Sequence, residues 1–201
     1  GFLALHPDGD KLYAVATRDK EGGAAGYRIG KDGSLELINF MPTGDGGGAH
    51  IAVHPSGKFL LTAQYGGGSV ALFPLDADGK LGKATVTEHE GGSGVVEKRQ
   101  ESPHPHWCGF SPDGNYALVP DLGMDGIVIY KVDAETPSIT KHAFAESIAG
   151  GGPRHMRFST DGKFIFLLNE LSLSVTTYAW DEEKGRASQL FVTPALSEEV
   201  K

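Results

Sequence analysis

The sequence predicts an all-β protein, a β-propeller of four-stranded antiparallel blades with about four blades in the chain. A repeat carries this prediction: a short apolar segment, a tight turn ending in glycine, and then a β-prone run. The four copies are FLALHPDG, HIAVHPSG, WCGFSPDG and HMRFSTDG, whose turn glycines Gly9, Gly57, Gly114 and Gly162 stand 48, 57 and 48 residues apart. In addition, no segment shows the sustained i, i+3, i+4 apolar spacing of a helix. A β-sandwich is the alternative all-β interpretation, but a sandwich needs no internal repeat.

Each repeat supplies strands in a fixed order. The innermost strand precedes the turn, and second strands are expected at residues 11–16, 58–63, 116–119 and 163–168. Third strands are expected at 69–73, 126–130 and 174–178, and fourth strands at 84–88, 140–145 and 187–193. These elements predict a single partial propeller domain over residues 1–201, with blades at about 1–41, 42–98, 99–149 and 150–201.

Composition and charge argue against several functions. With 18 basic and 26 acidic residues the net charge is −8, and no block of Lys and Arg could follow a phosphate backbone, so nucleic acid is not an expected partner. No apolar run is long enough to span a membrane. The lone Cys108 alternates in phase with His106 and Phe110, and is expected to be a small buried hydrophobe. No G-x-S-x-G elbow and no P-loop is present.

Candidate site residues emerge when the repeats are aligned on the turn glycine. The start of the innermost strand and the end of the second strand lie at one rim, so these positions surround one mouth of the channel. Eight residues before the glycine stand Gly1, Ala49, His106 and Arg154, and seven before it stand Phe2, His50, Trp107 and His155. Seven residues after the glycine stand Ala16, Gln64, Asp121 and Asn169, and eight after it stand Thr17, Tyr65, Leu122 and Glu170. Such variation is expected when a symmetric scaffold points different side chains at one ligand, although a solvent-filled mouth also collects polar residues.

Other histidines have simpler interpretations. His6 and His54 precede proline at the turn and are expected to cap it or to be exposed. His104 and His106 form a His-Pro-His segment whose side chains can share a face. Two histidines could begin a zinc site, but a third ligand would have to come from another blade, so neither a metal nor an organic cofactor is expected.

Two motifs resemble the signature of the seven-bladed lactonase family of β-propellers. One is RQESPHPH at 99–106, continued by SPDG at 111–114 and DLGMD at 121–125. The other is GPRHMRF at 152–158, followed by Asn169-Glu170-Leu171. The resemblance covers essentially the whole chain and implies a closed ring of seven blades. The chain, which opens within an apparent strand and without Met, is therefore expected to be a fragment that lacks about three blades.

The resemblance also implies a function. The family includes 6-phosphogluconolactonase and 3-carboxy-cis,cis-muconate cyclase, so we expect hydrolysis of a sugar lactone, most of all 6-phosphogluconolactone. Muconate cyclisation and non-catalytic ligand binding are the alternatives. The expected partners are a small anionic lactone and the remaining blades. The expected compartment is the cytoplasm, where sugar phosphates are metabolised, with export as the alternative.

By the same resemblance, His106, Arg154 and Glu170 are the expected catalytic residues. We expect His106 to be the base for the attacking water and Glu170 to orient or tune it. Arg154 is expected to bind the anionic group or the developing oxyanion, with His155 assisting. The remaining residues expected to line the pocket are His155, His104, His50, Gln100, Tyr65 and Asn169.

Overall fold

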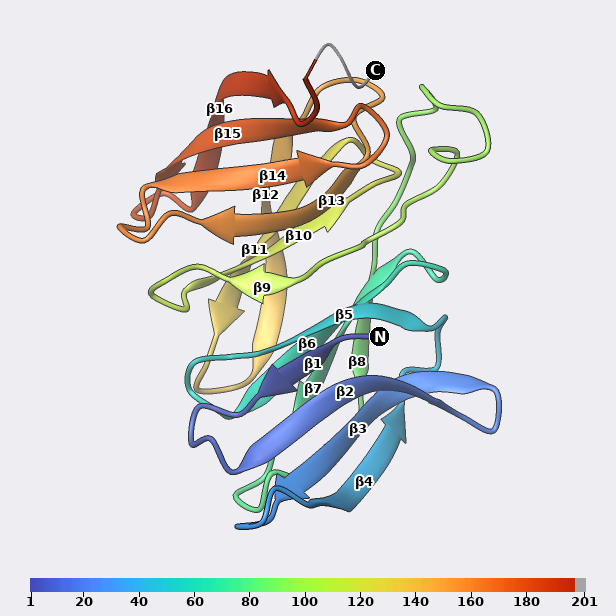
Figure 1. Cartoon of the computed structure of the whole chain (residues 1–201), viewed down its shortest axis with the longest axis vertical. Helices are drawn as coiled ribbons and strands as arrows, with labels where there is room; N and C mark the ends of the chain where they lie inside the picture. The colour runs from blue at the N-terminus through green and yellow to red at the C-terminus, as the bar shows by residue number, and fades with distance from the viewer. Residues whose placement is uncertain (198–201) are drawn as a thin grey trace.

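The computed structural model describes residues 1–197 and consists of four four-stranded antiparallel sheets (Figure 1). The first is β1 (Leu3–Leu5), β2 (Lys11–Arg18), β3 (Glu21–Ile29) and β4 (Leu35–Pro42), and the second is β5 (Gly48–Val53), β6 (Phe59–Gln64), β7 (Ser69–Pro74) and β8 (Thr85–Glu88). The third is β9 (Gly109–Phe110), β10 (Tyr116–Asp121), β11 (Gly126–Asp133) and β12 (Ser138–Glu146), and the fourth is β13 (Pro153–Phe158), β14 (Phe164–Asn169), β15 (Ser174–Asp181) and β16 (Arg186–Pro194). The described part of the chain contains no helix, and so none that could cross a membrane.

The sheets are successive blades of a β-propeller, which confirms the predicted fold class. Each uses four strands that are consecutive in sequence, and the blades follow one another from the blue end of Figure 1 to the red end. The innermost strand β5 contacts the neighbouring innermost strands β1 and β9. The innermost strands therefore lie on one side of the array of blades, as expected for the strand that begins each repeat.

The sequence missed β3 and β4 in the first blade. Strand β3 reads EGGAAGYRI, and glycine and alanine are poor β-formers, so no apolar alternation is visible there. Tertiary packing requires the small residues: a Cβ at Gly23 would collide with the carbonyl oxygen of Met41, and Ala24 and Ala25 are buried. Close approach between strands decided this element, not strand propensity.

Cores form between the blades, so the middle blades are covered on both faces. Every residue of β6 and β10 is buried. By contrast, β14 alternates between exposed and buried residues, because only one face of the fourth blade has a neighbour among residues 1–197. The uncovered face shows Phe164, Phe166 and Leu168.

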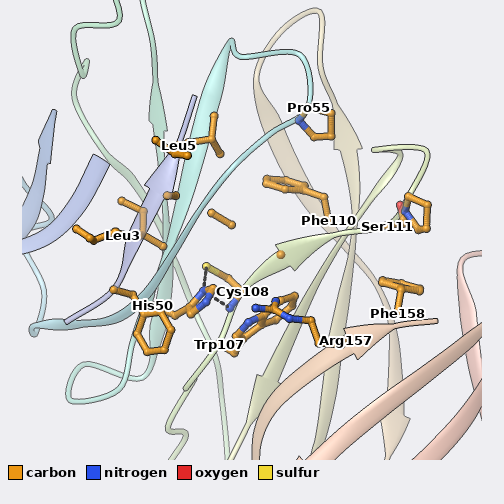
Figure 2. A pocket seen from close by; sticks show the side chains of 17 residues that line it. Leu3, Leu5, His50, Pro55, Trp107, Cys108, Phe110, Ser111, Arg157 and Phe158 are labelled. Atoms are coloured by element: carbon orange, nitrogen blue, oxygen red, sulfur yellow. Dashed lines mark hydrogen bonds between the residues drawn. The ribbon is translucent and has the colours of Figure 1, made fainter. Parts of the chain in front are cut away.

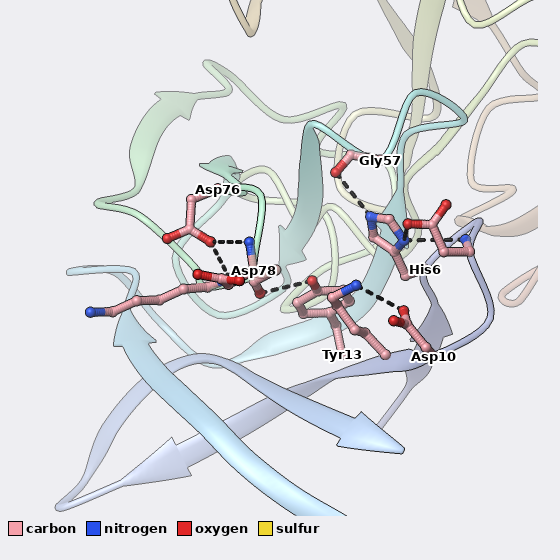
Figure 3. A network of polar contacts seen from close by, with 10 residues as sticks. His6, Asp10, Tyr13, Gly57, Asp76 and Asp78 are labelled. Atoms are coloured by element: carbon pink, nitrogen blue, oxygen red, sulfur yellow. Dashed lines mark hydrogen bonds and ion pairs between the residues drawn. The ribbon is translucent and has the colours of Figure 1, made fainter. Parts of the chain in front are cut away.

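At the turn rim, two histidines join adjacent blades (Figure 3 shows the first). His6 Nε2 donates to Gly57 O at 3.1 Å, and His54 Nε2 donates to Gly114 O at 3.0 Å. In each case Nδ1 accepts a backbone N–H two residues further on, from Asp8 at 3.2 Å and from Ser56 at 3.0 Å. These histidines therefore cap their own turns, as expected, and also hold the next blade. His54 is buried rather than exposed.

Candidate active site

Four ionisable side chains from two blades and one loop meet at the mouth opposite the turn rim. Arg154 Nε lies 2.8 Å from Glu170 Oε2, and Arg99 Nη2 lies 2.7 Å from Glu170 Oε1. The N–H of Arg154 Nε is shared with His106 Nε2 at 3.2 Å. Because the contact to Glu170 is shorter, the lone pair of His106 Nε2 is only weakly engaged.

Strand pairing explains why these residues meet. Arg154 lies at the start of β13 and Glu170 directly follows β14, so the hairpin brings them side by side, and Glu170 N donates to Gly152 O at 2.8 Å. His106 precedes β9 and is held on the neighbouring strand by its N–H, which donates to Pro120 O at 3.1 Å. Arg99 comes from the long loop between β8 and β9.

A ring of aromatic and imidazole groups lies against this cluster. The centroids of Phe2 and His50 are 4.6 Å apart, those of His50 and Trp107 5.1 Å, and those of His50 and His155 5.7 Å. His155 in turn lies 5.4 Å from His106. The four residues that stand seven before the turn glycine thus share one depth, as the alignment of the repeats predicts.

Three histidines at the mouth, His106, His155 and His50, are held neutral. Burial lowers the pKa of His106, and the charges of Arg154 and Arg99 add to this, against an opposing effect of Glu170. Burial, with smaller contributions from neighbouring His106 and Arg154, lowers the pKa of His155 to about 4. Burial also lowers the pKa of His50 to about 3. At neutral pH His106 is therefore an imidazole whose lone pair is only weakly engaged, the form that can accept a proton.

Glu170 is ionised and sits between two guanidinium groups. Its partial burial by itself raises its pKa, but the hydrogen bond from Arg99 and the charges of Arg99 and Arg154 outweigh burial and lower it. Two guanidiniums share one carboxylate, so with neutral histidines the cluster keeps one positive charge. This charge stands out in a chain whose net charge is −8.

The structure specifies one expectation about individual residues and changes two. Of the two expected roles of Glu170, its geometry favours tuning, because Glu170 pairs with the arginines and acts on His106 through its charge. Gln100 is fully buried, with its amide donating to Leu122 O at 2.8 Å and its Oε1 accepting from Val96 N at 3.1 Å. Asn169 is also fully buried, and its amide donates to Ser174 Oγ and Thr176 Oγ1. Both amides are engaged inside the fold, that of Gln100 with its own loop and the β10–β11 turn and that of Asn169 with β15.

Tyr65 and His104 do lie beside the cluster. Their rings stack with centroids 4.6 Å apart, and His104 Nδ1 donates to Tyr65 O at 2.8 Å. The ring of Tyr65 also meets His106 edge-on at 5.4 Å. Sequence reasoning missed Arg99 as a site residue, because it lies in a loop outside the aligned repeats. Its place at the start of the first motif was the available signal.

A cavity of about 630 Å³ continues the site along the innermost strands (Figure 2). Its lining includes Phe2, His50, Trp107 and Arg157, and the guanidinium of Arg157 lies 5.9 Å from the centroid of the Trp107 ring. Cys108 is fully buried here, which confirms the expectation, and burial raises the pKa of its thiol. A thiol held protonated in this way is a poor nucleophile.

The fold and the mouth together define a class: a β-propeller whose blades point unlike ionisable groups at a single site. The family described as "Lactonase, 7-bladed beta-propeller" matches residues 1–201, and the chain belongs to this family.

Named relatives agree with this assignment. A 6-phosphogluconolactonase of Bacillus subtilis is 32% identical over 98% of this chain and 56% of its own length. A 6-phosphogluconolactonase of Formosa agariphila is 36% identical over 89% of this chain and 52% of its own length. The structure of a periplasmic gluconolactonase of Pseudomonas aeruginosa superposes with a TM-score of 0.88 at 34% identity, covering 98% of this chain and 58% of that one. The chain thus spans a little over half the length of the relatives it matches.

Proposed function

We propose that the complete protein hydrolyses a sugar lactone, and that the lactone is 6-phosphogluconolactone. The observation that carries the proposal is the charge of the mouth: Arg99 and Arg154 share a single carboxylate, that of Glu170, beside the neutral His106. A site with a base and a surplus cation suits an anionic ester. The relatives named 6-phosphogluconolactonase support the choice of the phosphorylated lactone.

His106 is the base of the proposed reaction. Its Nε2 takes a proton from water while the water oxygen attacks the lactone carbonyl carbon. The tetrahedral intermediate collapses as the ring C–O bond breaks, and the protonated His106 returns the proton to the leaving ring oxygen. The product is the open-chain hydroxy acid. Burial supports this role because it keeps His106 unprotonated at neutral pH.

The two arginines have separate tasks. Arg154 shares its N–H with His106 and is thus placed to stabilise the oxyanion that forms beside the base. Arg99 enters from the loop and contacts the far oxygen of Glu170, so it is the residue we assign to the phosphate. Glu170 keeps both guanidiniums in position.

The remaining blades of the ring are the proposed partners of the two uncovered end faces. On the first blade Leu3 and Leu5 are 64% and 60% exposed, and on the fourth Phe166 and Phe191 are 44% and 66% exposed. Apolar exposure of this extent on sheet faces marks surfaces that another layer covers. As the compartment we propose the cytoplasm, where phosphorylated sugars are metabolised. One structural relative is described as periplasmic.

The test is turnover by the complete natural protein on three substrates. We expect loss of 6-phosphogluconolactone well above its spontaneous rate, slower loss of unphosphorylated gluconolactone, and no change in the diene absorbance of 3-carboxy-cis,cis-muconate. Loss of the diene absorbance without lactone hydrolysis would contradict the proposal and identify a cyclase. Ligand binding without turnover of any of the three would identify a non-catalytic propeller.

The substitution Arg99→Gln tests the phosphate assignment. We expect KM for the phosphorylated lactone to rise about 10-fold to 100-fold, the range for losing one charge-assisted contact, with a much smaller change for gluconolactone. Lys98→Gln is the matched control, since it removes the same charge from an exposed neighbouring side chain. Equal effects of Arg99→Gln on both lactones would show that Arg99 does not bind the phosphate.

A further inference from the structure

The turn between β10 and β11 buries two carboxylates that the proposed reaction does not use. Asp121 ends β10 and is fully buried, and Asp125, just before β11, is 6% exposed. Charged groups are costly to bury unless donors surround them, so such a pair indicates a specific task. The hydrogen bonds that each carboxylate accepts show what this task is.

Asp121 holds the His-Pro-His segment. Its Oδ1 accepts the backbone N–H of His104 at 2.8 Å, together with those of Gly123 at 2.9 Å and Met124 at 3.1 Å. Its Oδ2 lies 2.6 Å from Nδ1 of the buried His89, which comes from the end of the second blade. The position of His104, and with it that of His106 two residues later, therefore depends on this carboxylate.

Asp125 holds the segments that carry the other site residues. Its Oδ2 accepts the N–H of Gly150 at 2.7 Å, and its Oδ1 accepts the N–H of Gly152 at 2.9 Å and the side-chain amide of Gln100. Gln100 is the neighbour of Arg99, and Gly152 precedes Arg154 by two residues. The carbonyl oxygen of Gly152 also accepts the N–H of Glu170.

The equivalent turns of the neighbouring blades show that the turn itself does not require these carboxylates. The position of Asp121 is occupied by Gln64 in the second blade and by Asn169 in the fourth. The position of Asp125 is occupied by Gly68 and Leu173. All three residues at this second position have positive φ, at 54°, 76° and 50° respectively, so the turn conformation is the same with and without a carboxylate.

We propose that Asp121 and Asp125 are positioning residues, which set the relative placement of Arg99, His106, Arg154 and Glu170 through backbone and amide hydrogen bonds. One short turn thereby anchors two loop segments that are far apart in sequence, at residues 100–104 and 150–152. The role rests on the proposed lactone hydrolysis, since it concerns the same cluster. Displacement of a reacting group by about 1 Å can cost on the order of 10²-fold in rate, so loss of an anchor has a measurable effect.

The neighbouring blades suggest the test variants, Asp125→Gly and Asp121→Asn. Glycine already occupies the Asp125 position in the second blade, so Asp125→Gly keeps the positive φ and removes both acceptor oxygens. In the complete protein we expect kcat to fall on the order of 10²-fold with KM changed much less. For Asp121→Asn we expect a smaller fall in kcat, because an amide oxygen still accepts N–H groups.

The matched control is Asp133→Gly, at the opposite end of β11. Asp133 also accepts two backbone N–H groups, from Glu135 at 2.9 Å and Thr136 at 3.0 Å, but at the turn rim. We expect Asp133→Gly to lower the melting temperature less than Asp125→Gly does, because Asp133 is exposed, and to leave kcat unchanged. Wild-type kcat in folded Asp125→Gly, or an equal kcat loss in Asp133→Gly, would overturn the positioning role.

A second readout separates this proposal from the proposed function. Amide hydrogen exchange of Gly150 and Gly152, followed by NMR, is expected to quicken in Asp125→Gly and to stay unchanged in Asp133→Gly. If the wild-type protein hydrolyses no lactone, the proposed function fails and exchange alone decides whether Asp125 anchors the loop. Unchanged exchange at both glycines would overturn the anchor.

Discussion

The two rims of this propeller use histidine in opposite ways. At the turn rim, His54 is 5% exposed, and both of its ring nitrogens are satisfied by groups of its own turn and the next blade. At the mouth, His106 Nε2 accepts only a shared N–H from Arg154, and its Nδ1 has no hydrogen-bond partner among the described residues. The same residue type is a structural link at one rim and a chemically available base at the other.

The difference is one of remaining bonding capacity. A histidine whose two nitrogens are both bound to backbone groups cannot move a proton without breaking those bonds. A neutral histidine beside two guanidiniums and a carboxylate keeps a lone pair available, and the nearby charges shift its pKa. Substitutions at the turn rim should therefore change stability, and substitutions at the mouth should change activity.

The largest expected effect is that of His106→Ala on catalysis. We expect kcat/KM for the lactone to fall about 10²-fold to 10⁴-fold, which is the usual contribution of a general base. The free energy of unfolding should change by less than about 1 kcal/mol, since the ring has few bonds to lose. Parallel lactone assays and urea unfolding of the complete protein measure both quantities. Wild-type turnover in a folded His106→Ala protein would remove His106 from the mechanism.

An intermediate effect is expected from His54→Ala on stability. The substitution leaves Gly114 O without its donor and Ser56 N without its acceptor, so the free energy of unfolding should fall by about 1–3 kcal/mol, with kcat unchanged. His142→Ala is the control, because His142 also donates to a carbonyl of the next blade, that of Lys184, but is exposed. Its effect should stay within about 0.5 kcal/mol. Equal losses for the two variants would mean that burial is not what makes the turn-rim bond valuable.

The smallest expected effect is a pair of opposite pKa shifts at His106. Its pKa is lowered below 6.5, so activity should be constant around neutral pH and should fall as acid protonates the base. The charge of Glu170 raises this pKa and that of Arg154 lowers it. Glu170→Gln should therefore move the titration of His106 to lower pH, and Arg154→Met should move it to higher pH, each by about one unit or less because both partners are partly exposed.

An NMR titration of the His106 imidazole measures these shifts independently of turnover. The corresponding double variant should titrate near the wild-type pH, since the two effects cancel in part. Shifts of the same sign in both single variants would show that loop rearrangement, and not charge, controls the pKa of His106.

Much of the fold was accessible from local sequence. Turn glycines such as Gly57 and Gly114 have positive φ, which glycine adopts without strain, and the β-prone runs beside them became second strands. The exceptions were β3 and β4, and the small residues of β3 reflect contact with another strand. Apolar alternation cannot report a requirement of that kind.

The candidate site was accessible in part. Alignment on the turn glycine placed His50, Trp107 and His155 at one depth, and the structure brings their rings together. It could not show that Gln100 and Asn169 turn their amides inward. Whether an amide faces solvent depends on whether another segment of the chain offers it a hydrogen-bond partner.

The sequence by itself determined the repeat, the turns and the depth of each rim residue, because these follow from backbone conformation and strand period within one blade. Only the tertiary structure decided which charges pair. Arg99 and Glu170 are 71 residues apart and belong to different elements, so their contact depends on how the blades pack and on which loops reach the mouth. The same packing set the Asp121 and Asp125 anchors, because the partners they hold in place at the mouth belong to other segments of the chain.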